Sequence, residues 1–111
     1  MSDINAKIDE QVKNNDVFLY MKGTKYFPMC GFSGRVVQIL DYLGVDYQTA
    51  NVLEDQELRE GIKAYTNWPT IPQLYVKGEF VGGADIVTEM FQAGELLTHL
   101  TDKGVPVKQT A

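Results

Sequence analysis

The chain has an apolar run, a loop and a run with helical spacing in direct succession, and this order restricts the folds open to it. Residues 17–21 are all apolar and rich in strand formers, which is typical of a central strand. Residues 31–43 carry apolar side chains at helical spacing, and Gly44 suits the position after a helix. Residues 47–52 have the pattern of a second strand. The three runs predict a βαβ unit with a parallel strand pair and a right-handed crossover.

The remaining segments add helices and a hairpin to this unit. Ile4, Ile8 and Val12 recur every four residues and predict an amphipathic helix with Asp3 as its N-cap. The further expected elements are a helix over 54–65, a hairpin of strands 73–76 and 79–81, and a last helix capped by Asp85 that runs to about Lys103. This order predicts an α/β fold, with helices flanking a central four-stranded mixed sheet.

Length and composition predict one domain over residues 1–111, with its core at about 3–103 and a loose tail at 104–111. The net charge of -5 argues against a nucleic-acid-binding surface. No apolar run approaches the roughly 20 residues that span a membrane. The acidic N-terminus lacks the features of a signal or transit peptide, so we expect a cytoplasmic protein.

Cys30 is the only cysteine, and it lies where the predicted helix begins. Free N–H groups and partial positive charge at a helix N-terminus favour the thiolate, which is the reactive form. Pro28 prevents an earlier helix start, and Lys22 and Lys25 add positive charge. A single cysteine cannot form an internal disulfide, so Cys30 is free for chemistry. The alternative is a buried, inert cysteine, which is common for free cysteines.

Four segments resemble the signatures of the monothiol glutaredoxins, in the same order. They are residues 21–23 (Met-Lys-Gly), 30–33 (Cys-Gly-Phe-Ser), 68–73 (Trp-Pro-Thr-Ile-Pro-Gln) and 82–86 (Gly-Gly-Ala-Asp-Ile). The match runs from about Val17 to about Leu100 and looks most like the short, single-domain bacterial type. The resemblance implies a thioredoxin-like fold, in agreement with the predicted order of elements.

Ser33 stands where a dithiol oxidoreductase has its second cysteine. A hydroxyl cannot form a sulfur–sulfur bond, so any disulfide on Cys30 must be with an outside thiol. The resemblance names glutathione as that thiol. It also implies a glutathione site formed by Lys22, Arg59, Ile71, Pro72, Gly83, Ala84 and Asp85.

The resemblance gives each of these residues a role. Lys22 and Arg59 suit the glycine carboxylate, and Lys63 either assists them or is an ordinary surface cation. A cis bond before Pro72 would expose the backbone of Ile71 to a peptide-like ligand. Trp68 either packs over this site or belongs to the core or its edge.

At the last signature, the N–H groups of Ala84 and Asp85 would bind the γ-glutamyl carboxylate, and the Asp85 side chain its ammonium. Gly83, with Gly82, permits a close backbone approach. Many relatives have cysteine or serine in place of Ala84, so chemistry through a second thiol is not expected here.

The resemblance implies that the chain carries an iron–sulfur cluster. A 2Fe–2S cluster needs four thiolates or equivalents. Two chains and two glutathiones would supply them in a cluster-bridged homodimer, with Cys30 as the protein ligand. Such relatives pass clusters to recipient proteins and pair with BolA-like proteins.

A glutathione-dependent oxidoreductase that reduces protein–glutathione mixed disulfides through Cys30 is the alternative. Lys22 precedes Cys30 by eight residues, whereas dithiol glutaredoxins have their lysine three residues before the cysteine. The longer loop should shift bound glutathione towards the role of a ligand. We therefore expect a cluster carrier with weak oxidoreductase activity.

Several other residues are interpreted as structural. His99 is predicted to have a surface or packing role, away from the four signatures. Met21, Met29 and Met90 are predicted to fill gaps in the packing, as methionine usually does.

Overall fold

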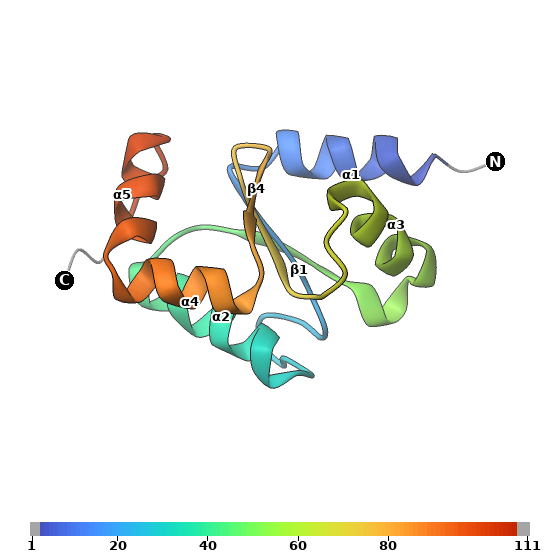
Figure 1. The fold of residues 1–111 in the computed structure, drawn as a ribbon, viewed down its shortest axis with the longest axis horizontal. Helices are drawn as coiled ribbons and strands as arrows, with labels where there is room; N and C mark the ends of the chain where they lie inside the picture. The colour runs from blue at the N-terminus through green and yellow to red at the C-terminus, as the bar shows by residue number, and fades with distance from the viewer. Residues whose placement is uncertain (1–2, 109–111) are drawn as a thin grey trace.

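A four-stranded mixed sheet lies at the centre of the computed structural model, which describes residues 3–108. Its strands are β1 (Val17–Met21), β2 (Gln48–Asn51), β3 (Gln73–Val76) and β4 (Glu79–Gly82), in the order β2-β1-β3-β4. β1 is parallel to β2 and antiparallel to β3, and β3 pairs with β4 in the predicted hairpin (Figure 1). The predicted βαβ unit and thioredoxin-like fold are confirmed.

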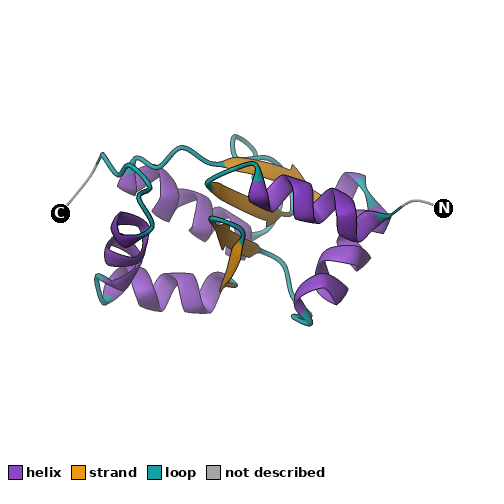
Figure 2. Ribbon diagram, turned by 90° about the horizontal axis from the view of Figure 1, so that it is seen from above, coloured by secondary structure: helices purple, strands orange, loops and turns teal. Residues whose placement is uncertain are grey.

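The helices cover both faces of this sheet. They are α1 (Ile4–Lys13), α2 (Gly31–Leu43), α3 (Gln56–Thr66), α4 (Ala84–Gln92) and α5 (Glu95–Asp102), with a 3₁₀ turn, η1, at Val52–Glu54. α1 and α3 pack together on one face, and α2 and α4 pack together on the other with α5 beside α4 (Figures 1 and 2). α1, α2 and α3 agree with the predicted helices within two residues at each end.

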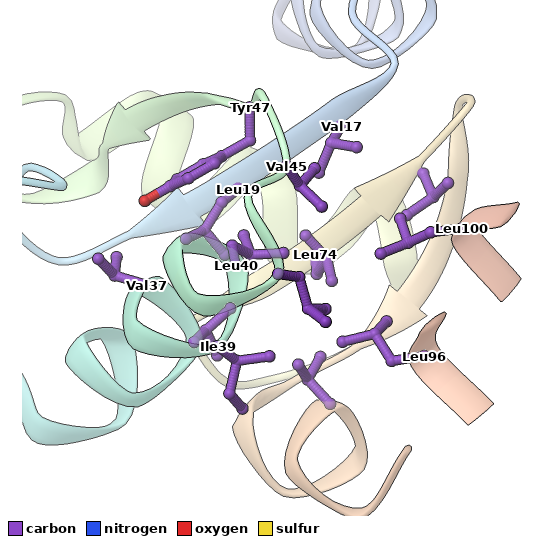
Figure 3. Close-up of a cluster of buried hydrophobic side chains, with 14 of the residues drawn as sticks. Val17, Leu19, Val37, Ile39, Leu40, Val45, Tyr47, Leu74, Leu96 and Leu100 are labelled. Atoms are coloured by element: carbon purple, nitrogen blue, oxygen red, sulfur yellow. The ribbon is translucent and has the colours of Figure 1, made fainter. Parts of the chain in front are cut away.

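β1 contributes to both hydrophobic cores because successive side chains on a strand point to opposite faces. Leu19 and its alternating neighbours Val17 and Met21 pack with Leu40 and other residues of α2 (Figure 3). Phe18 and Tyr20 pack instead with the side chains of α1 and α3. The wholly apolar run at residues 17–21 is therefore explained by a central strand covered on both faces.

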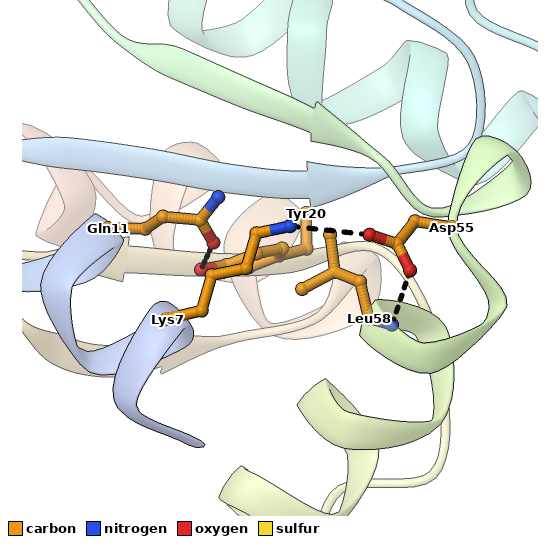
Figure 4. Close-up of polar contacts among 5 residues, drawn as sticks. All are labelled: Lys7, Gln11, Tyr20, Asp55 and Leu58. Carbon is orange, nitrogen blue, oxygen red and sulfur yellow. Dashed lines mark hydrogen bonds and ion pairs between the residues drawn. The ribbon is translucent and has the colours of Figure 1, made fainter. Parts of the chain in front are cut away.

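Polar contacts join α1 to the sheet and to α3 (Figure 4). The Tyr20 hydroxyl donates a hydrogen bond to Gln11 Oε1 at 2.7 Å. Asp55 caps α3 by accepting from the backbone N–H of Leu58 at 3.0 Å, and it also pairs with Lys7 Nζ at 3.3 Å. The Asp55 carboxylate thus both caps α3 and holds this helix against α1.

The region predicted as one last helix differs in two respects from the prediction. It is divided into α4 and α5, because Gly94 adopts a left-handed conformation (φ 78°) that ends the helix and redirects the chain. Helix α4 also begins one residue before Asp85, so the N-cap is Gly83 and Asp85 lies in the first turn. The break allows Val87 of α4 and Leu96 of α5 to enter the same core.

The segment after α5 packs more closely than expected from its sequence. Val105 is 5% exposed, and its N–H donates to Leu100 O at 2.9 Å. The backbone N–H of Lys108 donates to Leu43 O, at the end of α2, at 3.0 Å. The prediction of a loose tail is therefore wrong for 104–108, and residues 109–111 lie outside the described residues. No helix within residues 3–108 has the length and apolar character needed to cross a membrane.

Replacing Val105 by Ala should lower the free energy of unfolding by about 1–2 kcal/mol, because two buried methyl groups are lost. The neighbouring exposed residue provides a matched control, and Pro106→Ala should change stability by no more than about 0.5 kcal/mol. Urea unfolding followed by circular dichroism measures both values. Equal, small effects would show that this segment adds nothing to the core.

Candidate functional site

Cys30 is held at the start of α2 by a short, closed hairpin rather than by an irregular loop. The N–H of Met29 donates to Lys22 O at 2.9 Å, and Thr24 and Phe27 exchange backbone hydrogen bonds at 3.2 and 3.1 Å. Gly23 has φ 92°, and a Cβ there would lie 2.5 Å from the backbone of Met29 and of Phe27. Only glycine fits this turn, so Gly23 is needed to close the segment 22–29, here called the active-site hairpin.

Two contacts hold the active-site hairpin to the end of the sheet. Asn51 Oδ1 accepts from the N–H of Gly23 at 2.9 Å, and also from that of Leu53 at 3.0 Å. Lys25 Nζ donates to Tyr47 O at 3.0 Å and lies 4.6 Å from the centre of the Tyr47 ring. Neither Asn51 nor Tyr47 was predicted to have this role, since each lies more than 20 residues from its partner and no local pattern marks the contact.

The surroundings of Cys30 stabilise its thiolate. The pKa of Cys30 lies below that of an ordinary cysteine, chiefly because the backbone N–H of Ser33 bonds to the sulfur. Partial burial opposes this effect, while the N–H of Phe32, the charge of Lys22 and the Ser33 hydroxyl lower the pKa further. Helix α2 has no side-chain cap, which leaves these N–H groups for the sulfur. The alternative of a fully buried cysteine is therefore wrong, because Cys30 is only half-buried.

Ser33 has a structural role that its position in the motif does not reveal. Its side chain is fully buried, and its Oγ accepts a hydrogen bond from the backbone N–H of Lys22 at 3.1 Å. That bond ties the end of β1 to the first turn of α2. The serine thus positions the helix that carries Cys30.

A hollow of about 180 Å³ lies between the first turns of α2 and α4. It is lined by Phe32, Trp68, Thr70, Ile71, Pro72, Gly83, Ala84, Asp85 and Ile86. Five of the eight predicted site residues therefore meet here, and the Ile71–Pro72 bond is cis as expected. Cys30 and Gly31 line a second hollow, and Phe32, two residues after Cys30, lines the first.

Gln73 holds the loop that forms one wall of this hollow. It is fully buried, and its Nε2 donates to Trp68 O at 3.1 Å and to Thr70 O at 3.2 Å. Its Oε1 accepts from the hydroxyl of Thr66 at 3.1 Å. The sequence signal for this role is a polar amide at the start of an apolar strand, and the role was not predicted.

The opposite wall is the start of α4, where Gly83 allows a close approach. A Cβ at Gly83 would lie 3.2 Å from Trp68 Nε1 and 3.3 Å from Pro72 O, which is tighter than usual packing. The helix has no side-chain cap, so the first-turn N–H groups of Ala84 and Asp85 remain for a ligand. Asp85 is exposed, with its carboxylate at the same helix end.

The two predicted cations, Lys22 and Arg59, lie outside the hollow that the other predicted glutathione-binding residues line. Lys22 is half-buried and near enough to Cys30 to lower the pKa of its thiol. Arg59 lies on α3 and lines neither hollow, and its side chain forms no ion pair with any residue of 3–108. Lys63 on the same helix pairs with Glu60 at 3.9 Å, as an ordinary surface cation does.

The structure also places the residues that were interpreted as structural. Trp68 fulfils both alternatives, because it lines the hollow and packs against the Phe80 ring at 5.8 Å. Met21 is buried and Met90 packs against the core, as predicted. Met29 is 70% exposed, so the packing role predicted for it is wrong. His99 is half-buried on α5 and lines neither hollow at the site.

Substitution of Ser33 by Ala should raise the pKa of Cys30, because the hydroxyl that bonds to the thiolate is removed. The pH dependence of the alkylation rate with iodoacetamide measures this pKa. In the unmodified chain, the rate should reach half its maximum below the roughly 8.5 of a free cysteine. In Ser33→Ala, the midpoint should move upward, and stability should fall by about 1–3 kcal/mol because the Lys22 N–H loses its buried acceptor.

Thr24→Ala serves as the control, since the Thr24 hydroxyl bonds only within the active-site hairpin. An unchanged midpoint in Ser33→Ala would contradict this account of the thiol.

Comparison with known proteins agrees with this geometry. The family model described as Glutaredoxin matches residues 17–81, which is more than half of the chain. A monothiol glutaredoxin of Synechocystis sp. is 60% identical over 91 residues, which cover 82% of this chain and 85% of that protein.

Two solved structures are similar over almost the whole chain. A monomeric truncated mutant of Trypanosoma brucei 1-C-Grx1 has a TM-score of 0.87 and 40% identity, covering 98% of this chain and 99% of that one. A buckwheat glutaredoxin–glutathione complex has a TM-score of 0.80 and 27% identity, and the match covers 91% of this chain and 90% of that one. The sequence identities, the matched domain and the shared fold together show that this chain belongs to the glutaredoxin family, as one of its monothiol members.

Proposed function

We propose that this chain binds glutathione next to Cys30 and, as a cluster-bridged homodimer, carries a 2Fe–2S cluster to recipient proteins. One observation carries the proposal: Cys30, whose pKa is lowered, lies two residues before Phe32, which lines a hollow that ends at an uncapped helix N-terminus. Residues 3–108 contain no group of three or more His, Cys, Asp or Glu that could hold a metal. Any metal centre on this chain must therefore take ligands from outside it.

The hollow has the groups that glutathione requires. The first-turn N–H groups of Ala84 and Asp85 can bind the γ-glutamyl carboxylate, and the exposed Asp85 carboxylate its ammonium. The backbone of Ile71, before the cis bond to Pro72, can pair with the peptide part. The similar buckwheat glutaredoxin, which forms a complex with glutathione, supports this arrangement. The ligand's thiol would then lie towards Cys30, past Phe32.

The glycine carboxylate would lie at the far end of such an extended ligand. Lys22 and Arg59 lie outside the hollow, and neither is ion-paired with any residue of 3–108. An extended peptide covers about 3.3 Å per residue, so its end can reach beyond the hollow. A cation without a carboxylate partner is available for such a ligand.

The cluster is cargo in this proposal, and Cys30 is the chain's own ligand to it. A thiolate is the ligand that iron–sulfur centres prefer, and the lowered pKa of Cys30 favours this form. Two chains and two glutathione thiols complete the four sulfur ligands. The chain's residues would orient each glutathione and leave the thiolate open on one side.

A second candidate function, reduction of protein–glutathione mixed disulfides, is favoured by the same lowered pKa. The Cys30 thiolate can attack the glutathione sulfur and release the protein thiol. We propose this reaction as a weak secondary activity.

BolA-like proteins and cluster-accepting proteins are the proposed partners of this chain, and the cytoplasm is its proposed location.

Lys22→Ala and Arg59→Ala should each weaken glutathione binding several-fold or more, because a charge-assisted hydrogen bond contributes roughly 1.5–3 kcal/mol. Thermal stability should hardly change, since neither side chain is ion-paired. Calorimetric titration with glutathione measures the affinity, and Lys108→Ala is the matched control at the far end of α2. If Arg59→Ala behaves like the control while Lys22→Ala does not, Arg59 is outside the site.

The cluster-bridged homodimer is tested on protein reconstituted anaerobically with iron, sulfide and glutathione. Size-exclusion chromatography with iron and thiol quantification should find two chains, two irons and two glutathiones per particle. Cys30→Ser should lose cluster and dimer together but keep the fold. Ser33→Ala should keep the iron, because a hydroxyl is a poor ligand for this centre. A cluster-loaded monomer, or a cluster without small-molecule thiol, would overturn the proposal.

A further inference from the structure

The segment around Cys30 differs in charge from the rest of the chain. Residues 17–40 contain three cations, Lys22, Lys25 and Arg35, and no Asp or Glu. The whole chain has ten cations, fifteen carboxylates and a net charge of -5, so the remainder carries seven cations and fifteen carboxylates, a net charge of -8. A positive area beside the thiol therefore lies on an otherwise acidic protein.

The cations of this area are also free of carboxylate partners. Five lysines elsewhere are ion-paired: Lys7 with Asp55, Lys13 with Asp9, Lys63 with Glu60, Lys77 with Asp16, and Lys103 with Glu79. Lys22, Lys25 and Arg35 form no ion pair with any residue of 3–108. Lys25 donates to the carbonyl oxygen of Tyr47 and lies over its ring, and it shares a hollow with Asp41 and Asp46 without forming an ion pair with either.

Large apolar side chains are exposed in the same area. Tyr26 and Phe27, at the tip of the active-site hairpin, are 79% and 77% exposed, Met29 is 70% exposed, and Phe32 on α2 is 64% exposed. The hydrogen bonds that close the hairpin hold its tip in one backbone conformation. We call these four residues, with Lys22, Lys25 and Arg35, the basic aromatic face.

We propose that the basic aromatic face docks an acidic protein segment that carries apolar side chains and a cysteine, and thereby selects the thiols that react with Cys30. Aromatic side chains in a pre-formed turn can contact apolar side chains of the partner with little ordering cost. Unpaired cations attract carboxylates and speed the encounter.

Two other occupants fit the charges less well. Without a cluster and glutathione between them, two copies of this chain would bring three unpaired cations against the same three if the faces met about a two-fold axis. An anionic membrane surface would attract the face but repel a chain with a net charge of -5. The proposal rests on the Cys30 thiolate alone and not on the cluster.

The test follows disulfide exchange with two synthetic peptides, each containing one cysteine activated as a mixed disulfide with nitrothiobenzoate. The Cys30 thiolate attacks the peptide sulfur, a Cys30–peptide disulfide forms, the peptide–nitrothiobenzoate bond breaks, and the coloured nitrothiobenzoate anion leaves with the electron pair. One peptide has Glu and Leu around its cysteine, and the other has Lys and Leu in the same places. The protein is used without iron or glutathione, so the result is independent of cluster binding.

The acidic peptide should react faster by a factor on the order of ten at low ionic strength, within the range of electrostatic steering. The ratio should approach one in about 1 M salt, where the Debye length is about 3 Å. Arg35→Glu should reduce the ratio several-fold, because Arg35 is an exposed, unpaired cation of the face. Lys108→Glu makes the same charge change at the other end of the 13-residue helix α2, which is about 20 Å long, and should keep the ratio.

The aromatic part of the face is tested separately with Phe27→Ser. This variant should slow the acidic Leu peptide but not an acidic peptide with Ser in place of Leu. Equal rates for the acidic and basic peptides, or a ratio that survives both Arg35→Glu and high salt, would overturn the proposal. Sedimentation of the chain with phosphatidylserine vesicles, or self-association that Arg35→Glu abolishes, would assign the face to a membrane or to a second copy instead.

Discussion

The hydrogen bond from the backbone N–H of Lys22 to Ser33 Oγ connects the central strand to the reactive part of this protein. It joins the end of β1, whose side chains enter both cores, to the first turn of α2. The same serine bonds to the Cys30 sulfur through its N–H and its hydroxyl. Ser33, which in the motif marks only the absence of a second cysteine, therefore affects both the position and the pKa of the Cys30 thiol.

The chemistry of the site follows from donors that the fold leaves unpaired. Helices α1 and α3, on one face of the sheet, are capped by the aspartates Asp3 and Asp55, whereas α2 and α4 have no capping side chain at the site. Their free N–H groups serve the thiolate and the proposed carboxylate of glutathione. The cations near Cys30 are likewise unpaired, and a charge without a partner inside the chain is available to bind a charged group of another molecule.

Local patterns in the sequence determined most of the fold and half of the site. The βαβ unit, the hairpin at Lys77 and the first three helices were predicted, because each has its own apolar period or turn residues. The place of Cys30 followed from the local pattern, and the cis bond at Pro72 followed from the family resemblance. The predictions of one unbroken helix over 85–103 and of a loose segment at 104–108 were wrong, since the break at Gly94 and the burial of Val105 depend on contacts with a core formed elsewhere.

The sequence by itself determined that a lone thiol would stand at a helix N-terminus, because the apolar strand, Pro28 and the helical run fix that junction locally. Only the tertiary structure decided what surrounds it. Gln73 reaches back to the Trp68 loop, and Lys25 is held by Tyr47 across the sheet edge. Such contacts join residues whose spacing follows no period, so they arise only when the packed strands bring those segments together.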